Sequence, residues 1–392
     1  MGALLSTIVS VVIALAIVVG LFTAANLGVG RLSNRWEART RPWVFIGPAL
    51  IFVAIGLVFP ALRTIYLSLH AGDHGEGGWT LDNYRDALGD DTVLNFDGAG
   101  DILTSWLFRI AVLLVLLALG AAWISARRIA GVGGPRLSLS GPTPVTLLVF
   151  GVIALLFAIF STMRGVVWNN LWWVTAVTGL STVVGLLLAV LADRSRGETA
   201  AKTLIFMPMA ISMVGAAVIW SFVYNLPSAG QSPGLLNAII GALGIDQLDF
   251  VRSGRILPWN NFFIMIIMIW IQTGFAMVVF SAAIKSVPTE LVEAAKVDGA
   301  NDAQVFWRIT LPQIATTVAV VVTTLVVTVM KVFDLVKATT NGNFDTDVLA
   351  NRMYEGLRNG NFTQSSTFAV IILLLVVPVI WVNFRRARGE AR

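Results

Sequence analysis

The sequence predicts an all-α, polytopic membrane protein, a bundle of helices that cross a lipid bilayer. The chain of 392 residues is 57% hydrophobic and only 12% charged, which is about half the charged fraction of a soluble domain. Nine apolar stretches are long enough, or nearly so, to cross a hydrocarbon layer of about 30 Å. None of them alternates polar and apolar residues with the period of two that a transmembrane β-strand requires.

The apolar stretches predict about eight to nine spans, of which the fourth is the shortest. The first stretch lacks the positive residues that begin a secretory signal, because Met1, Gly2 and Ala3 carry no side-chain charge. We therefore expect it to be a retained helix. The stretches cover residues 4–28, 44–68, 103–123, 144–162, 168–192, 203–224, 261–284, 313–336 and 366–384.

Lys and Arg residues are concentrated in every second connection between the stretches, and this bias predicts the orientation of the chain in the membrane. If the N-terminus is outside, the cytoplasmic segments hold seventeen Lys and Arg residues and the outer segments hold seven. Short cytoplasmic loops of membrane proteins carry this excess, so we expect an outside N-terminus and a cytoplasmic C-terminus. The same bias explains the net charge of +5 without a nucleic-acid partner.

The residues that enzymes and metal sites use are scarce. The chain has no cysteine, which excludes a disulfide framework and thiol catalysis, and no Gly-Lys pair, which excludes ATP binding through a P-loop. His70 and His74 lie beside Asp73 and Glu76, and we interpret this group as a solvated loop because a single acidic loop lacks the rigid surroundings that metal ligands need. We expect no catalytic residue, no metal and no bound cofactor in this chain.

One predicted cytoplasmic connection, residues 285–314, is longer than two neighbouring spans need, and we call it the elbow. Pro288 suits the first turn of a helix that ends at Gly299, which we expect at the tightest point of the elbow. Asn301 and Gln304 have the spacing of a capping box for a second short helix. The elbow is either an amphipathic segment lying on lipid or a docking helix for a cytoplasmic partner.

The elbow resembles the EAA loop of ATP-binding-cassette (ABC) importer permeases, written E-A-A-x3-G-x9-I-x-L-P. This resemblance implies the type I transmembrane domain of such importers and a coupling helix that sits in a cleft of an ATPase subunit. ATP and Mg would then bind the partner ATPase and not this chain. The matching residues, with every spacing met, are Glu293, Ala294, Ala295, Gly299, Ile309, Leu311 and Pro312.

Further segments resemble carbohydrate importers of the maltose type, and the α-glucoside subgroup in particular. The resemblance implies an oligosaccharide permease of the bacterial cell membrane that works by alternating access. The implied partners are a second permease, two copies of a cytoplasmic ATPase, and a sugar-binding protein or lipoprotein outside. The segments are L-D-N-Y at 81–84, V-D-G-A at 297–300, F-W-R-I-T-L-P at 306–312, K-V-F-D-L-V at 331–336 and T-N-G-N-F at 340–344.

The resemblance does not cover the whole chain, and its limits suggest a division into four parts. We expect an extra N-terminal span with a cytoplasmic linker at 1–43, and a first core span with an outer loop at 44–102. An additional membrane hairpin follows at 103–164. The core permease spans, with the elbow, occupy 165–392.

Polar and aromatic side chains within three spans are candidates for a sugar pathway, because such groups are otherwise rare in a membrane. Pro208 predicts a kink in the sixth stretch, and the spacing of Lys331 and Asp334 predicts a shared helical face on which they neutralise each other. The resemblance implies a site among the sixth, seventh and eighth stretches. The candidates are Met209, Ser212, Met213, Trp270, Gln272, Thr273, Lys331, Phe333 and Asp334.

Three other functions remain open on the residues alone. An ion-coupled secondary sugar transporter would carry ionisable residues at mid-membrane near broken helices, whereas here most lie near the ends of spans. An ABC permease for glycerol phosphate would need a basic cluster facing the pathway, where Lys331 alone is available. A membrane scaffold would use the elbow merely to recruit a partner.

Overall fold

The computed structural model describes residues 2–31, 34–129, 142–193, 195, 197–227, 232–252 and 259–390. The described residues form helices and no strands, apart from two isolated bridges that pair His70 with Trp79 and Asn95 with Arg164. The all-α class predicted from the sequence is confirmed. The chain divides into two compact units, Met1–Leu67 and Ser68–Arg392.

The first unit is a pair of long helical segments. Helix α1 (Gly2–Val29) packs against α2 (Asn34–Val53), with Phe22 and Phe45 in edge contact at 5.4 Å between ring centres. A π-helical turn η1 (Ala54–Val58) continues α2 into α3 (Phe59–Ser68). The first two apolar stretches of the sequence therefore both lie on helices.

The second unit holds the remaining helices, and the longest of them are α6, α7, α8, α12 and α19. Their order along the chain is α4 (Asp82–Gly89), α5 (Ala99–Thr104), α6 (Trp106–Ile129), α7 (Pro142–Thr162), α8 (Val166–Asp193), α9 (Glu198–Phe206), η2 (Met207–Ala210), α10 (Met213–Tyr224), α11 (Leu235–Ala242), α12 (Trp259–Lys285), α13 (Thr289–Val297), α14 (Asp302–Val305), η4 (Phe306–Thr310), α15 (Leu311–Gln313), α16 (Ala315–Met330), α17 (Asp334–Thr339), α18 (Leu349–Arg358) and α19 (Phe362–Glu390).

Five described helices are long and apolar enough to cross a membrane, or seven spans if each of two bent helix pairs counts as one. The bent pairs are α9–α10, which turns by 103° around η2, and α14–α16, which turns by 69°. The fourth apolar stretch lies on α7, whose described apolar part is the shorter segment Thr146–Thr162. The nine stretches thus fall largely on helices, but the sixth is bent sharply at η2 and the eighth extends past the end of α16 at Met330.

The core of the second unit lies where α8, α12 and α16 pack together. Helices α8 and α12 approach so closely at Gly185 that a Cβ added there would lie 2.6 Å from the Cβ of Ala276. Small residues at such crossings let helices in membranes gain packing energy. Large side chains, among them Trp173 and Phe280, fill the remaining space and are fully buried.

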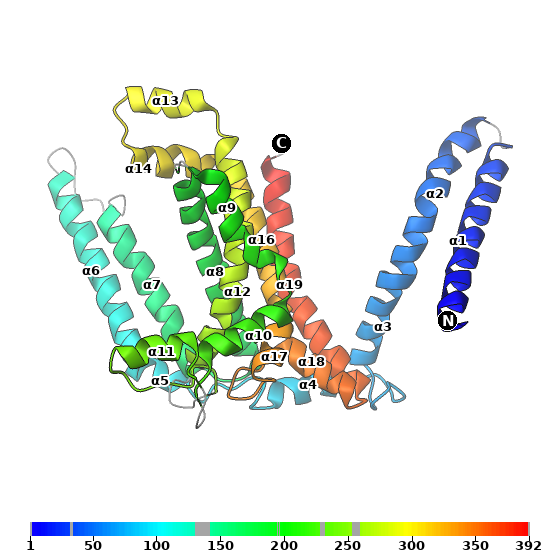
Figure 1. Cartoon of the computed structure of the whole chain (residues 1–392), viewed down its shortest axis with the longest axis horizontal. Helices are drawn as coiled ribbons and strands as arrows, with labels where there is room; N and C mark the ends of the chain where they lie inside the picture. The colour runs from blue at the N-terminus through cyan, green and yellow to red at the C-terminus, as the bar shows by residue number, and fades with distance from the viewer. Residues whose placement is uncertain are drawn as a thin grey trace. The chain divides into compact units, whose positions relative to one another are not determined.

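The connections of the second unit gather at two opposite ends of the bundle (Figure 1). Helices α13 and α14 and the C-terminal part of α19 lie at one end, which we call the elbow end. Helices α4, α11, α17 and α18 lie at the other, which we call the far end. The elbow and the C-terminus, both predicted to be cytoplasmic, therefore share an end, while the orientation of that end in the membrane stays a prediction.

Candidate functional site

The elbow begins with two short helices, α13 and α14, that are joined by a tight turn, and it continues through η4 and α15. Helix α13 begins directly after Pro288, one residue later than predicted, and Gly299 ends it with a φ of +84°. The amide of Ala300 donates to the carbonyl of Ala295 at 2.9 Å, which closes the turn. The predicted capping box is confirmed, because Asn301 and Gln304 exchange side-chain and backbone hydrogen bonds of 2.9 Å each.

Helix α13 buries none of its side chains in the chain itself. Leu291 is exposed and Val297 is 87% exposed, although both are apolar. The helix packs against α14 and η4, and Lys296 lies 3.4 Å from Asp302 of α14. Such a helix offers its apolar side chains to another surface.

The motif residues of the elbow fall into two groups. Glu293, Ala294, Ala295 and Gly299 lie on or just after α13, where only Ala295 is half-buried. A Cβ added to Gly299 would meet no atom within 4 Å. The expectation that Gly299 lies at a tight point is therefore wrong, since its positive φ and not lack of space favours glycine there. The others, Ile309, Leu311 and Pro312, lie on η4 and α15, where the chain turns toward α16.

The predicted kink in the sixth stretch is confirmed, and it is a sharp bend. Pro208 lies in η2, and Ser212 caps α10 by accepting a hydrogen bond of 3.0 Å from the amide of Gly215. Helix α12 passes so close to α9 that a Cβ on Gly274 would lie 2.6 Å from the carbonyl oxygen of Ile205. The bend therefore packs against the middle of α12.

Six pathway candidates lie around this bend. Met209 and Ser212 are exposed, whereas Gln272 and Thr273 are buried in α12, and the hydroxyl of Thr273 makes no hydrogen bond to described residues. Trp270 packs against Trp220 of α10, with 5.8 Å between ring centres. The sequence reasoning missed Trp220, although it follows the bend by two helical turns. The sixth candidate is Met213, the first residue of α10.

The other three candidates lie at a break that the sequence did not predict. Helix α16 ends at Met330, and α17 begins at Asp334. Lys331 and Asp334 are both exposed and form no ion pair, so the predicted shared helical face is wrong. Phe333 lies instead against Tyr354 of α18, with 5.0 Å between ring centres. No hydrogen bond, ion pair or ring contact among the described residues joins these three candidates to the six at the bend.

Three asparagine side chains, two of them buried, explain the break. Asn170 of α8 donates to the carbonyl of Met330 at 3.1 Å and accepts from the amide of Leu349 at 2.7 Å, so it holds the end of α16 and the start of α18 together. Asn169 and Asn260 hold the loop between α17 and α18 by donating to carbonyls of residues 344–347. Buried polar groups of the backbone need such partners where a helix stops.

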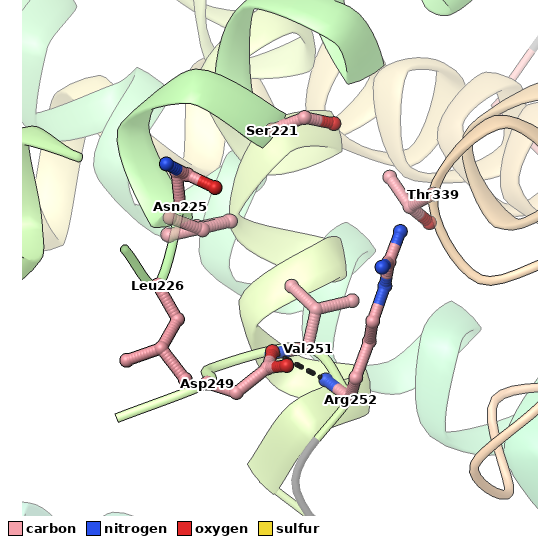
Figure 2. A pocket seen from close by; sticks show the side chains of 8 residues that line it. Ser221, Asn225, Leu226, Asp249, Val251, Arg252 and Thr339 are labelled. Carbon is pink, nitrogen blue, oxygen red and sulfur yellow. Dashed lines mark hydrogen bonds between the residues drawn. The ribbon is translucent and has the colours of Figure 1, made fainter. Parts of the chain in front are cut away.

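A pocket of about 370 Å³ at the far end was missed entirely by the sequence reasoning. Figure 2 shows the carboxylate of Asp249 accepting from the backbone amide of Arg252, whose side chain extends toward Thr339. Its residues come from three separate segments, so no spacing in the sequence could bring them together. The lining is Ser221, Tyr224, Asn225, Leu226, Asp249, Val251, Arg252 and Thr339.

The histidine loop differs from its interpretation as a solvated loop. His74 is exposed, but His70 is buried, with its ring 4.5 Å from that of Trp79. The interpretation is therefore wrong for His70, because Asn83 donates to its carbonyl at 2.8 Å and folds the loop back over it. Among the described residues, no group of three or more His, Cys, Asp or Glu side chains is placed to hold a metal ion.

Two carboxylates at the far end have shifted pKa values of opposite sign. Burial raises the pKa of Asp347, although Asn351 and Arg352 both bind this carboxylate. The hydrogen bond from Lys337, at 2.5 Å, lowers the pKa of Glu355. These groups fix α18 to its neighbours and belong to the framework around the α16–α17 break.

Comparison with known proteins decides the family. Residues 181–386, which include the bend, the elbow and the break, match the family described as binding-protein-dependent transport system inner membrane component. The chain belongs to this family. The permease, as we now call it, is therefore an inner membrane component of an ABC importer, and the resemblance of the elbow to the EAA loop is in keeping with this assignment.

The permease is similar to several curated proteins. It is 39% identical to the alpha-glucoside transport system permease protein of Rhizobium meliloti, over 90% of this chain and 83% of that one. It is 49% identical to the osmoprotective compounds uptake permease protein of Synechocystis, over 57% of this chain and 80% of that one. It is 30% identical to an sn-glycerol-3-phosphate transport system permease protein of Escherichia coli, over 57% of this chain and 75% of that one.

Among solved structures, the permease resembles a bacterial ABC transporter involved in the import of alginate. The TM-score is 0.54 at 20% identity, covering 92% of this chain and all of that one. This likeness shows the shared fold of an ABC importer transmembrane domain.

Proposed function

We propose that the permease carries an α-glucoside type of oligosaccharide into the cytoplasm and that its elbow binds a separate ATPase. The observation that carries the proposal is α13, a helix that projects from one end of the bundle (Figure 1) and has no fully buried side chain. A helix that must seat in a cleft of another protein needs this exposure. Its small residues Ala294 and Ala295 leave the backbone open to close approach.

The substrate class rests on the similarity that covers most of the chain. The Rhizobium meliloti relative, which is named for alpha-glucoside transport, aligns over 90% of the permease. A sugar pathway would use the aromatic and polar candidates around the bend, where Trp270 and Trp220 bring two indole rings together. Aromatic faces and hydroxyl groups suit a neutral, polyhydroxylated ligand.

Alternating access would connect these two sites. ATP and Mg would bind on the partner ATPase, whose closure would draw the elbows of two permease subunits together. The bundle would then open outward and take sugar from a binding protein, and hydrolysis would restore the inward-facing state. In this scheme the permease transmits force and forms the pathway, and the chemistry takes place on the ATPase.

The test is reconstitution of the permease with the proposed partners, which are a second permease, an ATPase and a sugar-binding protein from the same organism. We expect uptake of radiolabelled maltose or trehalose into proteoliposomes only when ATP and binding protein are both present. Uptake should persist when ionophores collapse ion gradients. Uptake driven by an ion gradient without ATP would overturn the proposal in favour of a secondary transporter, and ATP hydrolysis without any transport would favour the scaffold.

The similarity to the Synechocystis protein supports a second candidate cargo, a small osmoprotective solute. The same proteoliposomes distinguish the two cargoes. If the cargo is an oligosaccharide, an excess of unlabelled oligosaccharide should abolish the uptake of radiolabelled sugar, and if the cargo is an osmoprotective solute it should not. Glycerol phosphate has less support. The nine pathway candidates include one cation, Lys331, and one anion, Asp334, and therefore offer no net positive charge to a phosphate.

A further inference from the structure

Four charged side chains meet where the elbow leaves the bundle, and we call them the hinge cluster: Asp193, Glu198, Lys202 and Lys285. Asp193 is the last residue of α8, and Glu198 is the first of α9. Lys285 is the last residue of α12 and the first of the elbow. None of the sequence patterns above pointed to this cluster.

The inner part of the cluster is a compact, partly buried ion pair. The Lys202 ammonium lies 2.5 Å from Asp193 Oδ1, which also accepts a hydrogen bond of 2.7 Å from Ser281 of α12. The side chains of Lys202 and Asp193 are only 19% and 13% exposed. The other carboxylate oxygen of Asp193 is buried and makes no hydrogen bond to described residues. Removing one partner of such a pair leaves an uncompensated charge, which is strongly destabilising.

The outer part of the cluster is different in kind. Glu198 Oε1 accepts from Lys202 of its own helix at 2.6 Å and also from Lys285 of α12. The Lys285 side chain is 54% exposed. Solvated pairs of this kind contribute little free energy and can break and form again at small cost.

The position of the outer pair makes it a link between the end of α12, which leads into the elbow, and the start of α9. Helix α13 packs against α14 and η4 and begins four residues after Lys285. A displacement of α13 therefore reaches the bundle on one side through η4 and α16, and on the other through the end of α12, where Glu198 holds Lys285 to α9. Helix α9 in turn leads into the bend at Pro208, beside the pathway candidates Met209 and Ser212.

We propose that Glu198 and Lys285 are positioning residues of the transport cycle, whose ion pair holds the elbow to the α8–α9 corner in this conformation and opens when the elbow moves. This inference rests on the proposed function. The inner pair of Lys202 and Asp193 keeps the corner folded, and the outer pair sets the balance between two positions of the elbow. A ligand shifts the equilibrium between two conformations only when the interaction free energies of those conformations differ.

The first test compares Lys285→Met with Lys285→Arg in the complete transporter in proteoliposomes. We expect Lys285→Met to raise the number of ATP molecules hydrolysed per sugar imported by about two- to fivefold, the population shift that a solvated ion pair can supply. Lys285→Arg should keep the wild-type ratio, because it preserves the pair. The number of ATP molecules per imported sugar distinguishes a positioning role from a structural one. Loss of stability alone would lower the amount of assembled transporter and leave this number unchanged.

A matched control removes an ion pair from the far end. Glu355→Gln breaks the contact with Lys337, which is 2.5 Å long, and should leave the ratio at its wild-type value. A wild-type ratio in Lys285→Met would overturn the inference while leaving the proposed function intact. Absence of ATP-dependent import in the unaltered complex would overturn both.

The second test uses the absence of cysteine from the chain. Glu198→Cys combined with Lys285→Cys can be bridged by a short bis-methanethiosulfonate reagent without side reactions in the permease. We expect the bridge to stop uptake and a reducing agent to restore it. Full uptake by the bridged transporter would show that this contact need not open, and would refute the inference.

Discussion

Gly299 shows how a single residue sets the direction of the elbow. Its φ of +84° costs other residues about 1–2 kcal/mol, while the space around it is open. We expect Gly299→Asp to abolish uptake and leave the amount of permease in the membrane unchanged, because the substitution disturbs the turn and adds charge to an exposed surface. Gly299→Asn should retain more uptake than Gly299→Ala, since Asn tolerates this conformation better. Uptake assays with immunoblots of membranes measure both quantities.

Gly360 provides a matched control for this experiment. It also has a positive φ, of +78°, and open space around it, but it follows α18 at the far end. Gly360→Asp should therefore retain transport. Equal loss of uptake in Gly360→Asp and Gly299→Asp would mean that backbone strain alone is responsible, and would contradict a docking role for the elbow.

The residues that could be predicted are those whose partners are near in sequence. Asn301 finds Gln304 three residues away, so the capping box follows from spacing alone. Lys331 and Asp334 have the same separation, yet α16 stops before them because Asn170, 160 residues earlier, binds the carbonyl of Met330. No local sequence pattern indicates a hydrogen bond between residues that are 160 positions apart.

The helices follow the same rule: features that depend on neighbouring residues could be predicted, and features that depend on distant segments could not. The apolar stretches and Pro208 predicted the helices and the kink, because length and proline geometry act locally. The size of the bend at η2, 103°, depends on the close passage of α12 at Gly274 and could not be predicted. The pocket at the far end and the hinge cluster are assembled from separate segments, and the sequence contains no signal for either.

The contact between α17 and α18 should depend on pH. The hydrogen bond from Lys337 lowers the pKa of Glu355 below its ordinary value of about 4.3. The pair therefore stabilises the folded state fully above about pH 4.3, and its contribution disappears as the pH falls through the lower pKa of the folded state. We expect Glu355→Gln to lower the melting temperature slightly at neutral pH and not at all well below pH 4. Thermal unfolding in detergent across this range measures it, and a decrease that is independent of pH would contradict it.

At the scale of the whole molecule, the orientation of the bundle can be tested directly. Because the chain has no cysteine, Lys296→Cys on α13 and Arg358→Cys on α18 each give a single thiol at an exposed site at one end. A maleimide that cannot cross membranes should label Arg358→Cys in intact spheroplasts, and Lys296→Cys only after permeabilisation. The reverse pattern would place the elbow outside and exclude its contact with a cytoplasmic ATPase.

Helix α13 contributes no buried side chain to the fold of its own chain. The residues that stabilise the bundle are therefore different from those that α13 presents to a partner. Substitutions on such a surface change stability by only about half a kilocalorie per mole. The nine residues of α13 can therefore be rewritten without rebuilding the bundle behind them. On the proposed docking role, grafting the corresponding stretch of another importer onto this scaffold should direct the permease to that importer's ATPase, so that one transmembrane bundle accepts a different energy-coupling subunit.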